Sequence, residues 1–414
     1  MSSGRSIPVA SSPGIRGDWL LLLILCAGAF TTALNVTLLS PLVVKIADEF
    51  KVSEAAAGQL ATLTAASSGL LAVVVAPWMD RYSRSFWLRL ECGLLASGTI
   101  LSALAPSFEL MFVGRALAGL GGSVIGANCL AACAELYSHP HDRNRAIGLI
   151  NTAFTLGAVI GLPLVTLTAS WTDWRWAIAL PAPLALLVFA ATRRLPQTSR
   201  RRDGSLWAAW KSGYGRVLRS RETVLLLTAM IMVMVVWFGW LIFFGAFTEN
   251  VYGVSASVLS LLFLAGGGAE IVANNLAPLL LRNRTPRAVA YPVIIISAIN
   301  LVMVGLAFDR QWTMFPFIFI GSASGAMLFV CLNIALLDSL PGDSGAVMSL
   351  QSACLEIGGS IGVAITGLGL AIIDDYEMVY RLLGVMSPLI ALAVWLSARR
   401  SGPSRHAEPA IAAA

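Results

Sequence analysis

The chain contains 414 residues, of which 57% are hydrophobic and 12% are charged, with a formal net charge of +6. Ordinary soluble domains carry about 25% charged residues, so this composition excludes a soluble enzyme of the usual kind. It indicates a protein that crosses a membrane many times, and the lipid bilayer is its first predicted partner.

About twelve long apolar spans follow one another between residues 19 and 398. A helix needs about 20 apolar residues to cross a hydrocarbon layer of roughly 30 Å. The sequence therefore predicts an all-α membrane protein with only short loops, its transmembrane helices lying near 19–41, 54–79, 86–105, 110–136, 145–169, 174–192, 223–247, 256–281, 288–307, 313–337, 344–371 and 378–398.

Landmarks in the first six spans recur in the last six at an offset of 201 residues. Ala76-Pro77 returns as Ala277-Pro278, Gly157 as Gly358 and Gly161 as Gly362. Parallel repeats of this kind are typical of secondary transporters. We predict two pseudo-symmetric six-helix bundles, and the segments are an N-terminal stretch 1–18, a bundle 19–192, a linker 193–222, a second bundle 223–398 and a tail 399–414.

Most of the 28 Lys and Arg residues fall in loops on one side of this topology, which we call the arginine-rich end. By the positive-inside rule this side is cytoplasmic. Both termini and the linker are therefore predicted to be cytoplasmic, in a multi-pass protein of the plasma (inner) membrane. The uneven distribution also explains the net charge without a nucleic-acid partner.

Ionisable residues inside the spans are costly and therefore indicate function. Glu270 lies midway along the eighth span after Gly266-Gly267-Gly268, a triplet that predicts a weakened or broken helix. Glu356 lies midway along the eleventh span. Both are predicted proton-coupling sites. The alternative for Glu270 is a structural hydrogen bond to a neighbouring helix, and for Glu356 it is structural pairing with a buried cation. Glu91 is expected to extend toward the membrane surface near Arg89.

Other polar and small residues of the spans have predicted roles in a cavity or in packing. Hydrogen-bonding side chains expected to line a substrate cavity are Asn35, Asn128, Asn274 and Gln351. The glycine pairs, each four residues apart on one helical face, are expected to let helices approach closely; these are Gly157 with Gly161 and Gly358 with Gly362.

A membrane-embedded enzyme is the alternative from another class. Ser322 and Ser324 stand in the small-residue run "GSASG", but a serine nucleophile needs a basic partner at membrane depth. The three histidines all lie in loops or the tail: His139, His141 and His406. We predict no enzyme activity, no cofactor and no metal site, and without a GK[ST] phosphate-binding motif ATP hydrolysis by this chain is excluded.

Motifs in the first bundle resemble the major facilitator superfamily, and in particular its drug and arabinose-type efflux branch. "APWMDRYSRS" (76–85) resembles the loop that latches the two bundles on the cytoplasmic side, and implies gate roles for Asp80, Arg81 and Arg84. Glu135 in "CAELY" fits the acidic partner of that loop. Ala76, Ser83 and Ser85 depart from the family's usual residues in this loop.

Two further elements of the first bundle carry the same resemblance, which covers nearly the whole chain. "RALAGLG" (115–121) resembles the family's fourth-helix motif and implies a role in proton transfer or cavity electrostatics for Arg115. "GLINTAFTLGAVIGLP" (148–163), which ends at Pro163, resembles the fifth-helix signature of exporters.

The resemblance implies a monomeric secondary transporter in which protons drive a small amphiphilic compound outward by alternating access. The alternatives are a sugar or metabolite exporter, a uniporter without obligatory proton coupling, or a membrane sensor that does not transport.

Overall fold

A computed structural model of the chain describes residues 19–75, 82–137, 140–195, 214–340 and 344–398. At a few positions inside its helices, among them Glu135, only the backbone is described. The described part is helical apart from its connections and one isolated bridge between Val304 and Phe308.

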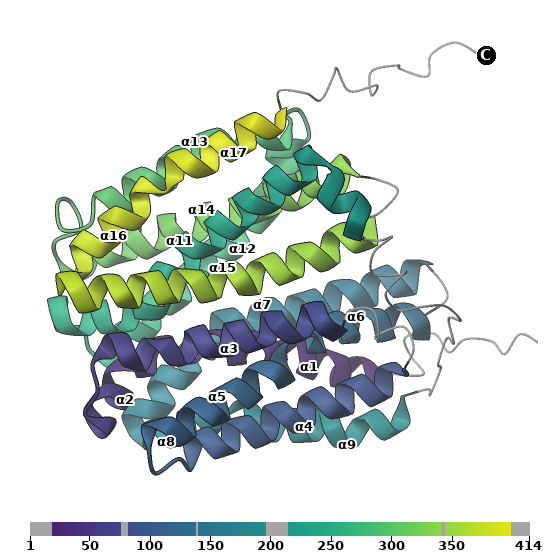
Figure 1. The fold of residues 1–414 in the computed structure, drawn as a ribbon. Helices are drawn as coiled ribbons and strands as arrows, with labels where there is room; N and C mark the ends of the chain where they lie inside the picture. Colours follow the sequence, from purple (N-terminus) through teal and green to yellow (C-terminus); the bar gives the residue numbers. More distant parts are fainter. Residues whose placement is uncertain (1–18, 76–81, 138–139, 196–213, 341–343, 399–414) are drawn as a thin grey trace, which may run out of the picture.

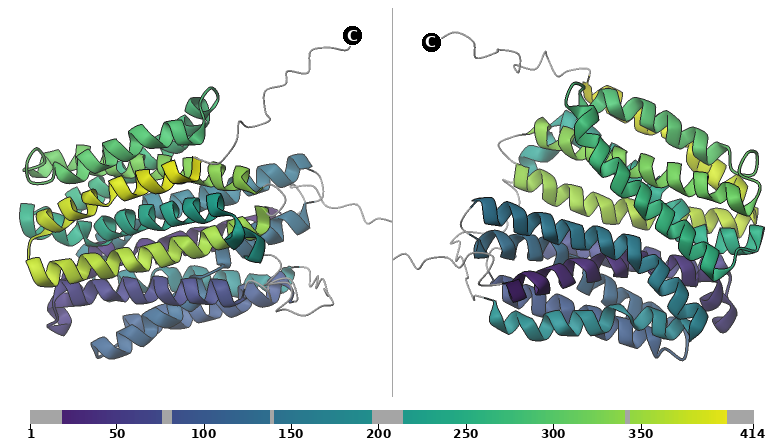
Figure 2. Two further views of the ribbon diagram at one scale, coloured as in Figure 1. Left: turned by 45° about the horizontal axis from the view of Figure 1, so that its top comes forward. Right: turned by 180° about the vertical axis from the view of Figure 1, so that it is seen from behind.

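The helices form two bundles that lie side by side, the N-terminal one coloured from purple through blue to teal and the C-terminal one from teal through green to yellow (Figures 1 and 2). The first bundle contains α1 (Trp19–Thr37), η1 (Ser40–Leu42), α2 (Val43–Phe50), α3 (Glu54–Val75), α4 (Arg84–Ala103), α5 (Phe108–Gly122), α6 (Ile125–Leu136), α7 (Pro140–Trp171), α8 (Trp174–Ala179), α9 (Pro181–Ala191) and η2 (Thr192–Arg194). The second contains α11 (Arg221–Tyr252), α12 (Ala256–Leu281), α13 (Pro286–Val302), η3 (Gln311–Thr313), α14 (Met314–Ser339), α15 (Ser344–Ile373), α16 (Tyr376–Val385) and α17 (Ser387–Ala398).

Each of the twelve predicted spans coincides with a helix or with a pair of consecutive helices. Nine helical segments of the described residues are long and apolar enough to cross a membrane. The spans interrupted in the structure are the fourth, between α5 and α6, the sixth, where Pro181 begins α9, and the last, between α16 and α17. The short helix α2, which the sequence did not predict, packs against α3.

The predicted break at Gly266-Gly267-Gly268 is wrong, because α12 runs without interruption from Ala256 to Leu281. Intrinsic propensity disfavours glycine in a helix by about 1 kcal/mol per residue, but tertiary packing overrides it. A Cβ added at Gly266 would lie 3.0 Å from Ile318 Cγ1 of α14, and one at Gly267 would lie 2.6 Å from Val159 Cγ2 of α7. The glycines serve close contact between helices.

Landmark glycines that lie 201 positions apart share not only their type but also their contacts within each bundle. A Cβ at Gly157 of α7 would lie 2.5 Å from the Phe30 carbonyl of α1. At Gly358 of α15, the corresponding distance is 2.6 Å, to the carbonyl of Ile231 in α11. Ile231 is the counterpart of Phe30 at that same offset, so each bundle contains the same glycine-mediated contact between its first and fifth spans.

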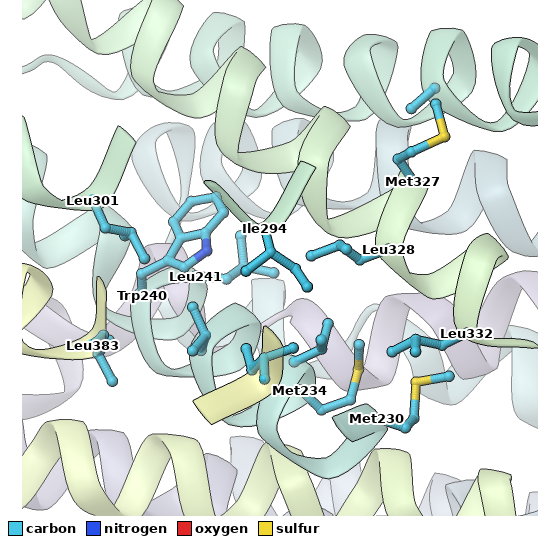
Figure 3. Close-up of a cluster of buried hydrophobic side chains, with 14 of the residues drawn as sticks. Met230, Met234, Trp240, Leu241, Ile294, Leu301, Met327, Leu328, Leu332 and Leu383 are labelled. Atoms are coloured by element: carbon cyan, nitrogen blue, oxygen red, sulfur yellow. The ribbon is translucent and has the colours of Figure 1, made fainter. Parts of the chain in front are cut away.

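Three buried apolar clusters hold the molecule together. One lies within the N-terminal bundle and extends from Leu21 to Leu195. Another fills the C-terminal bundle, where Met230, Trp240 and Leu332 are among its members (Figure 3). The third includes residues of both bundles, such as Leu38 and Phe243, and it lies away from the arginine-rich end. We call this third group the shared cluster.

Candidate functional site

A cavity of about 150 Å³ lies between the two bundles. Its walls come from α1 and α7 of the N-terminal bundle and from α11, α12 and α14 of the C-terminal bundle. The lining residues are Ala33, Val36, Thr37, Phe154, Ala158, Leu162, Trp237, Phe238, Leu241, Phe263, Gly266, Gly267, Glu270, Ile318 and Ser322. The wall is mainly aliphatic and aromatic, as in most small-molecule sites.

Glu270 is the only ionisable residue in this lining. Its helix α12 packs against α7, and the close approach of Gly267 to Val159 brings these two helices together. The half-buried carboxyl faces the space between the bundles instead of lying sealed inside one of them. A single polar charged group in an apolar wall can fix the orientation of a ligand or hold a proton.

Glu356 lies at the other contact between the bundles, where α15 packs along α3. A Cβ added at Gly69 of α3 would lie 2.9 Å from the Glu356 Cβ. The Ser68 hydroxyl forms a side-chain hydrogen bond with the carboxyl group. One turn further along α15, the Ser360 hydroxyl donates to the Thr62 carbonyl at 3.1 Å. Glu356 is therefore in the α3–α15 interface and not in the lining of the cavity.

The repeat relates the positions of the two carboxyls. At the offset of 201 residues, Gly69 corresponds to Glu270 and Thr155 corresponds to Glu356. Because Gly69 contacts Glu356, the pseudo-symmetry places one carboxyl at the α3–α15 interface and one at the α7–α12 interface, at equivalent depth. Both belong to the C-terminal bundle, and neither has an acidic counterpart in the first repeat.

Polar contacts join the bundles at the end opposite the arginine-rich end. Asn250 Nδ2 of α11 donates to Glu54 Oε1 of α3 at 2.5 Å, and the Tyr376 hydroxyl of α16 donates to Glu54 Oε2. The Ser40 hydroxyl also donates to the Leu241 carbonyl at 2.6 Å. These groups adjoin the shared cluster, so this end of the molecule is closed by both polar and apolar contacts.

The Glu54 contacts were missed by the sequence analysis. Glu54 and Tyr376 are 322 positions apart, and neither stands in a recognisable motif. The sequence signal is limited to the position of Glu54, Asn250 and Tyr376 at span ends, where polar residues are common and carry little information.

Arg115 is fully buried within the N-terminal bundle. Its Nε donates to Thr64 Oγ1 at 3.2 Å and its Nη2 to Asn35 Oδ1 at 3.2 Å. Its Nη1 has no hydrogen-bond partner in the described part of the chain, and no carboxylate there forms a salt bridge with it. The predicted proton role of Arg115 stays a prediction, and the residue does not belong to the lining of the cavity.

Glu91 does not extend toward the membrane surface, so that expectation is wrong. The residue is 1% exposed, and Asn128 Nδ2 donates to its Oε2 at 3.1 Å. Arg89 turns away and donates from Nε to the Thr192 hydroxyl. Glycines at the contact let α4 and α5 pack closely beside Glu91, and this packing is a constraint that linear spacing does not reveal.

The other predicted cavity residues lie in different settings. Asn35 and Asn128 are buried in the N-terminal bundle and Gln351 is buried in α15. Asn274 is exposed on α12, one turn beyond Glu270. None of the four belongs to the lining of the cavity, and their roles in binding stay predictions.

The predicted gate lies largely outside the described residues. Asp80 and Arg81 fall in the undescribed loop, and only the backbone of Glu135 is described, in the last turn of α6. Arg84 is the first residue of α4. Pro163, the end of the predicted exporter motif, lies inside the continuous helix α7. The gate and exporter assignments therefore stay predictions.

Comparisons with known proteins agree with this architecture. A family model described as Major Facilitator Superfamily matches residues 25–363. The puromycin resistance protein pur8 of Streptomyces alboniger is 24% identical over 349 residues, with 69% of each chain covered. The purine ribonucleoside efflux pump NepI of Escherichia coli (strain K12) is 24% identical over 347 residues, covering 81% of this chain and 83% of that protein.

Another relative bears a regulatory name. The transcription regulatory protein OpdE of Pseudomonas aeruginosa is 26% identical over 417 residues, covering 97% of this chain and 99% of that protein. Among solved structures, a bacterial homologue of the human lysosomal transporter Spinster, in an inward-facing and occupied conformation, matches with a TM-score of 0.74. It is 17% identical, and the match covers 94% of this chain and 98% of that one, which shows a common fold.

Proposed function

Because the chain belongs to the Major Facilitator Superfamily and is a membrane transporter, we propose that it is a proton-coupled antiporter that exports a small amphiphilic organic compound. The observation that carries this proposal is the position of Glu270, in the lining of an otherwise uncharged cavity between the bundles. A substrate with apolar surface and one polar or cationic group fits such a wall. The names of pur8 and NepI support outward transport of an organic compound.

Proton coupling requires a group that binds a proton on one side of the membrane and releases it on the other. Glu270 and Glu356 both lie where the bundles meet, and movement of one bundle against the other would change the surroundings of both. Each charge that crosses a potential of 100 mV supplies about 2.3 kcal/mol, which corresponds to roughly fiftyfold accumulation. This is sufficient for useful export even without a pH gradient.

We infer that the state described is open toward the arginine-rich end, which the charge distribution predicts to be cytoplasmic. The shared cluster and the Glu54 contacts hold the bundles together at the other end. The fold also matches an inward-facing structure. Export would then begin with substrate entering the cavity from the cytoplasm, with both termini on that side of the plasma membrane.

Counterflow in proteoliposomes tests transport directly. Purified chain is reconstituted with a high internal concentration of unlabelled puromycin or a purine ribonucleoside, and uptake of the labelled compound is followed. A growth screen of a hypersensitive host against a panel of toxic compounds, run alongside, tests direction and substrate class together. If none of the compounds that the screen identifies shows counterflow, the proposal is contradicted.

A second candidate function is signalling by a membrane sensor that does not transport. It is favoured by the name of OpdE, whose match extends over nearly all of this chain. A sensor would bind a ligand without counterflow. A uniporter or metabolite exporter would show counterflow that a protonophore and an imposed pH gradient leave unchanged.

A further inference from the structure

The side chains of Glu91 and Asn128 form an isolated buried pair inside the N-terminal bundle, away from the cavity. Glu91 of α4 is 1% exposed and Asn128 of α6 is 0% exposed. Asn128 Nδ2 donates to Glu91 Oε2 at 3.1 Å. The two remaining oxygens, Glu91 Oε1 and Asn128 Oδ1, are buried and have no hydrogen-bond partner among the described residues.

Among the residues that the structure describes, the surroundings of the pair contain no compensating charge. No Lys, Arg or His forms a salt bridge with Glu91 in the described part of the chain. The titratable groups that interact with it are thiols, Cys92 on its own helix and Cys129 on α6. The arginines of the neighbouring elements are engaged elsewhere: Arg115 with Asn35 and Thr64, Arg175 with Glu49, and Arg89 with Thr192.

Helix packing around the pair is tight. A Cβ added at Gly121 of α5 would lie 2.6 Å from the Glu91 carbonyl oxygen, and one at Gly98 would lie 2.6 Å from the Gly114 carbonyl. The backbones of α4 and α5 are thus in direct contact, which leaves little space for solvent. An ionised carboxylate without a cation is very costly in such a place.

We propose that the Glu91–Asn128 pair is a proton-binding site, in which a proton on Glu91 Oε1 is donated to Asn128 Oδ1. The two side chains then form a cyclic acid–amide pair with two reciprocal hydrogen bonds. One added hydrogen satisfies both unpaired oxygens and removes the buried charge. This site goes beyond the proposed function, because it is separate from the carboxyls at the bundle interface and does not depend on substrate.

Other occupants explain the geometry less well. A bound sodium ion needs several oxygen ligands, and this pair supplies two free ones. A water that donates to both oxygens would leave the carboxylate ionised, with no cation paired to it among the described residues. Both alternatives require an ionised Glu91, and this is what the test measures.

Infrared spectroscopy of the full chain in lipid nanodiscs at neutral pH tests the site. The wild type should show the C=O band of a protonated carboxyl, and a component of it should be absent in Glu91→Gln but present in Glu270→Gln and Glu109→Gln. Asn128→Ala should shift that component, since the Glu91 carboxyl group loses its hydrogen-bond partner. Asn128→Ala also provides the readout if Glu91→Gln folds poorly.

Thermal unfolding gives an independent measurement. A glutamine at position 91 can exchange two amide hydrogen bonds with Asn128, so Glu91→Gln should have the melting temperature of the wild type. Replacing sodium by choline in the buffer should not change the melting temperature of the wild type. If Glu91→Gln retains every component of the carboxyl band and Asn128→Ala shifts none of them, the proposal is overturned. Stabilisation of the wild type by sodium that Glu91→Gln abolishes would assign the site to a metal ion instead.

Discussion

The two bundles share a packing scheme but place their charged groups differently. The N-terminal bundle keeps Arg115 and Glu91 inside its own core, each with an asparagine partner. The C-terminal bundle places Glu270 and Glu356 at the surfaces that meet its partner. The two repeats therefore share the glycine contact that builds each bundle, while the interface carboxyls that we propose for coupling occur in only one of them.

The largest effect is expected from the interface carboxyl that lines the cavity. Glu270→Gln keeps the size of the side chain but cannot release a proton, so pH-driven uptake into inverted vesicles should be abolished while counterflow of substrate remains measurable. Glu356→Gln should reduce the same uptake. The matched control is Glu109→Gln, since Glu109 is exposed in the first turn of α5. Unchanged pH-driven uptake in both interface variants would discard the division of roles between the bundles.

The shared packing scheme predicts equal losses of stability in the two bundles. Gly157→Ala and Gly358→Ala each force a Cβ against a backbone carbonyl, at 2.5 Å and 2.6 Å. Overpacking of this kind costs about 1–3 kcal/mol, so both variants should lower the melting temperature by similar amounts. Gly126→Ala is the control, because a Cβ there meets nothing within 4 Å. A large loss in one variant alone would show that the repeats are not equivalent in packing.

The contacts at the closed end predict a shift between conformations. Glu54→Ala removes the acceptor for both Asn250 and Tyr376. Hydrogen bonds to charged groups contribute about 1.5–3 kcal/mol when buried, and partial exposure reduces this, so we expect about a tenfold shift toward opening at that end.

Spin labels at Leu104 and Leu306, exposed positions at the same end of each bundle, would report this opening as a longer distance. Glu109→Ala is the matched control, since it also removes an acidic residue from the first turn of a helix at that end. Equal distance distributions in Glu54→Ala and Glu109→Ala would rule out a latch at Glu54.

The smallest effect is expected from neighbouring glycines of α12. In Gly267→Ala a Cβ would meet Val159 Cα at 2.9 Å across the bundle interface, whereas Gly268→Ala meets nothing within 4 Å. We expect Gly267→Ala to slow transport a few-fold with little change in stability, because α7 and α12 can no longer approach fully. Gly268→Ala should transport at the wild-type rate. The reverse order of the two rates would contradict the interface described.

The sequence predicted the parts of the molecule that depend on periodicity and repetition. Span positions follow from hydropathy, the two bundles follow from the 201-residue repeat, and a close helix contact at Gly157 follows from four-residue spacing, although the spacing does not say that the partner is α1. It could not predict the continuity of α12 or the burial of Glu91, since both depend on which helix packs alongside. The same is true of the Glu54 contacts, whose partners come from the other bundle.

The shared cluster also limits how the two conformations can differ in energy. When the closed end opens, apolar side chains such as Leu38 and Phe243 lose contacts across the bundles and meet water or lipid. At about 25 cal/mol per Å² of apolar area exposed to water, an area mismatch of about 100 Å² between the two ends corresponds to about 2.5 kcal/mol, roughly a seventyfold bias. Rim residues on opposite faces of the membrane therefore have to be matched in area, and a single leucine at either rim could set the resting state of the molecule.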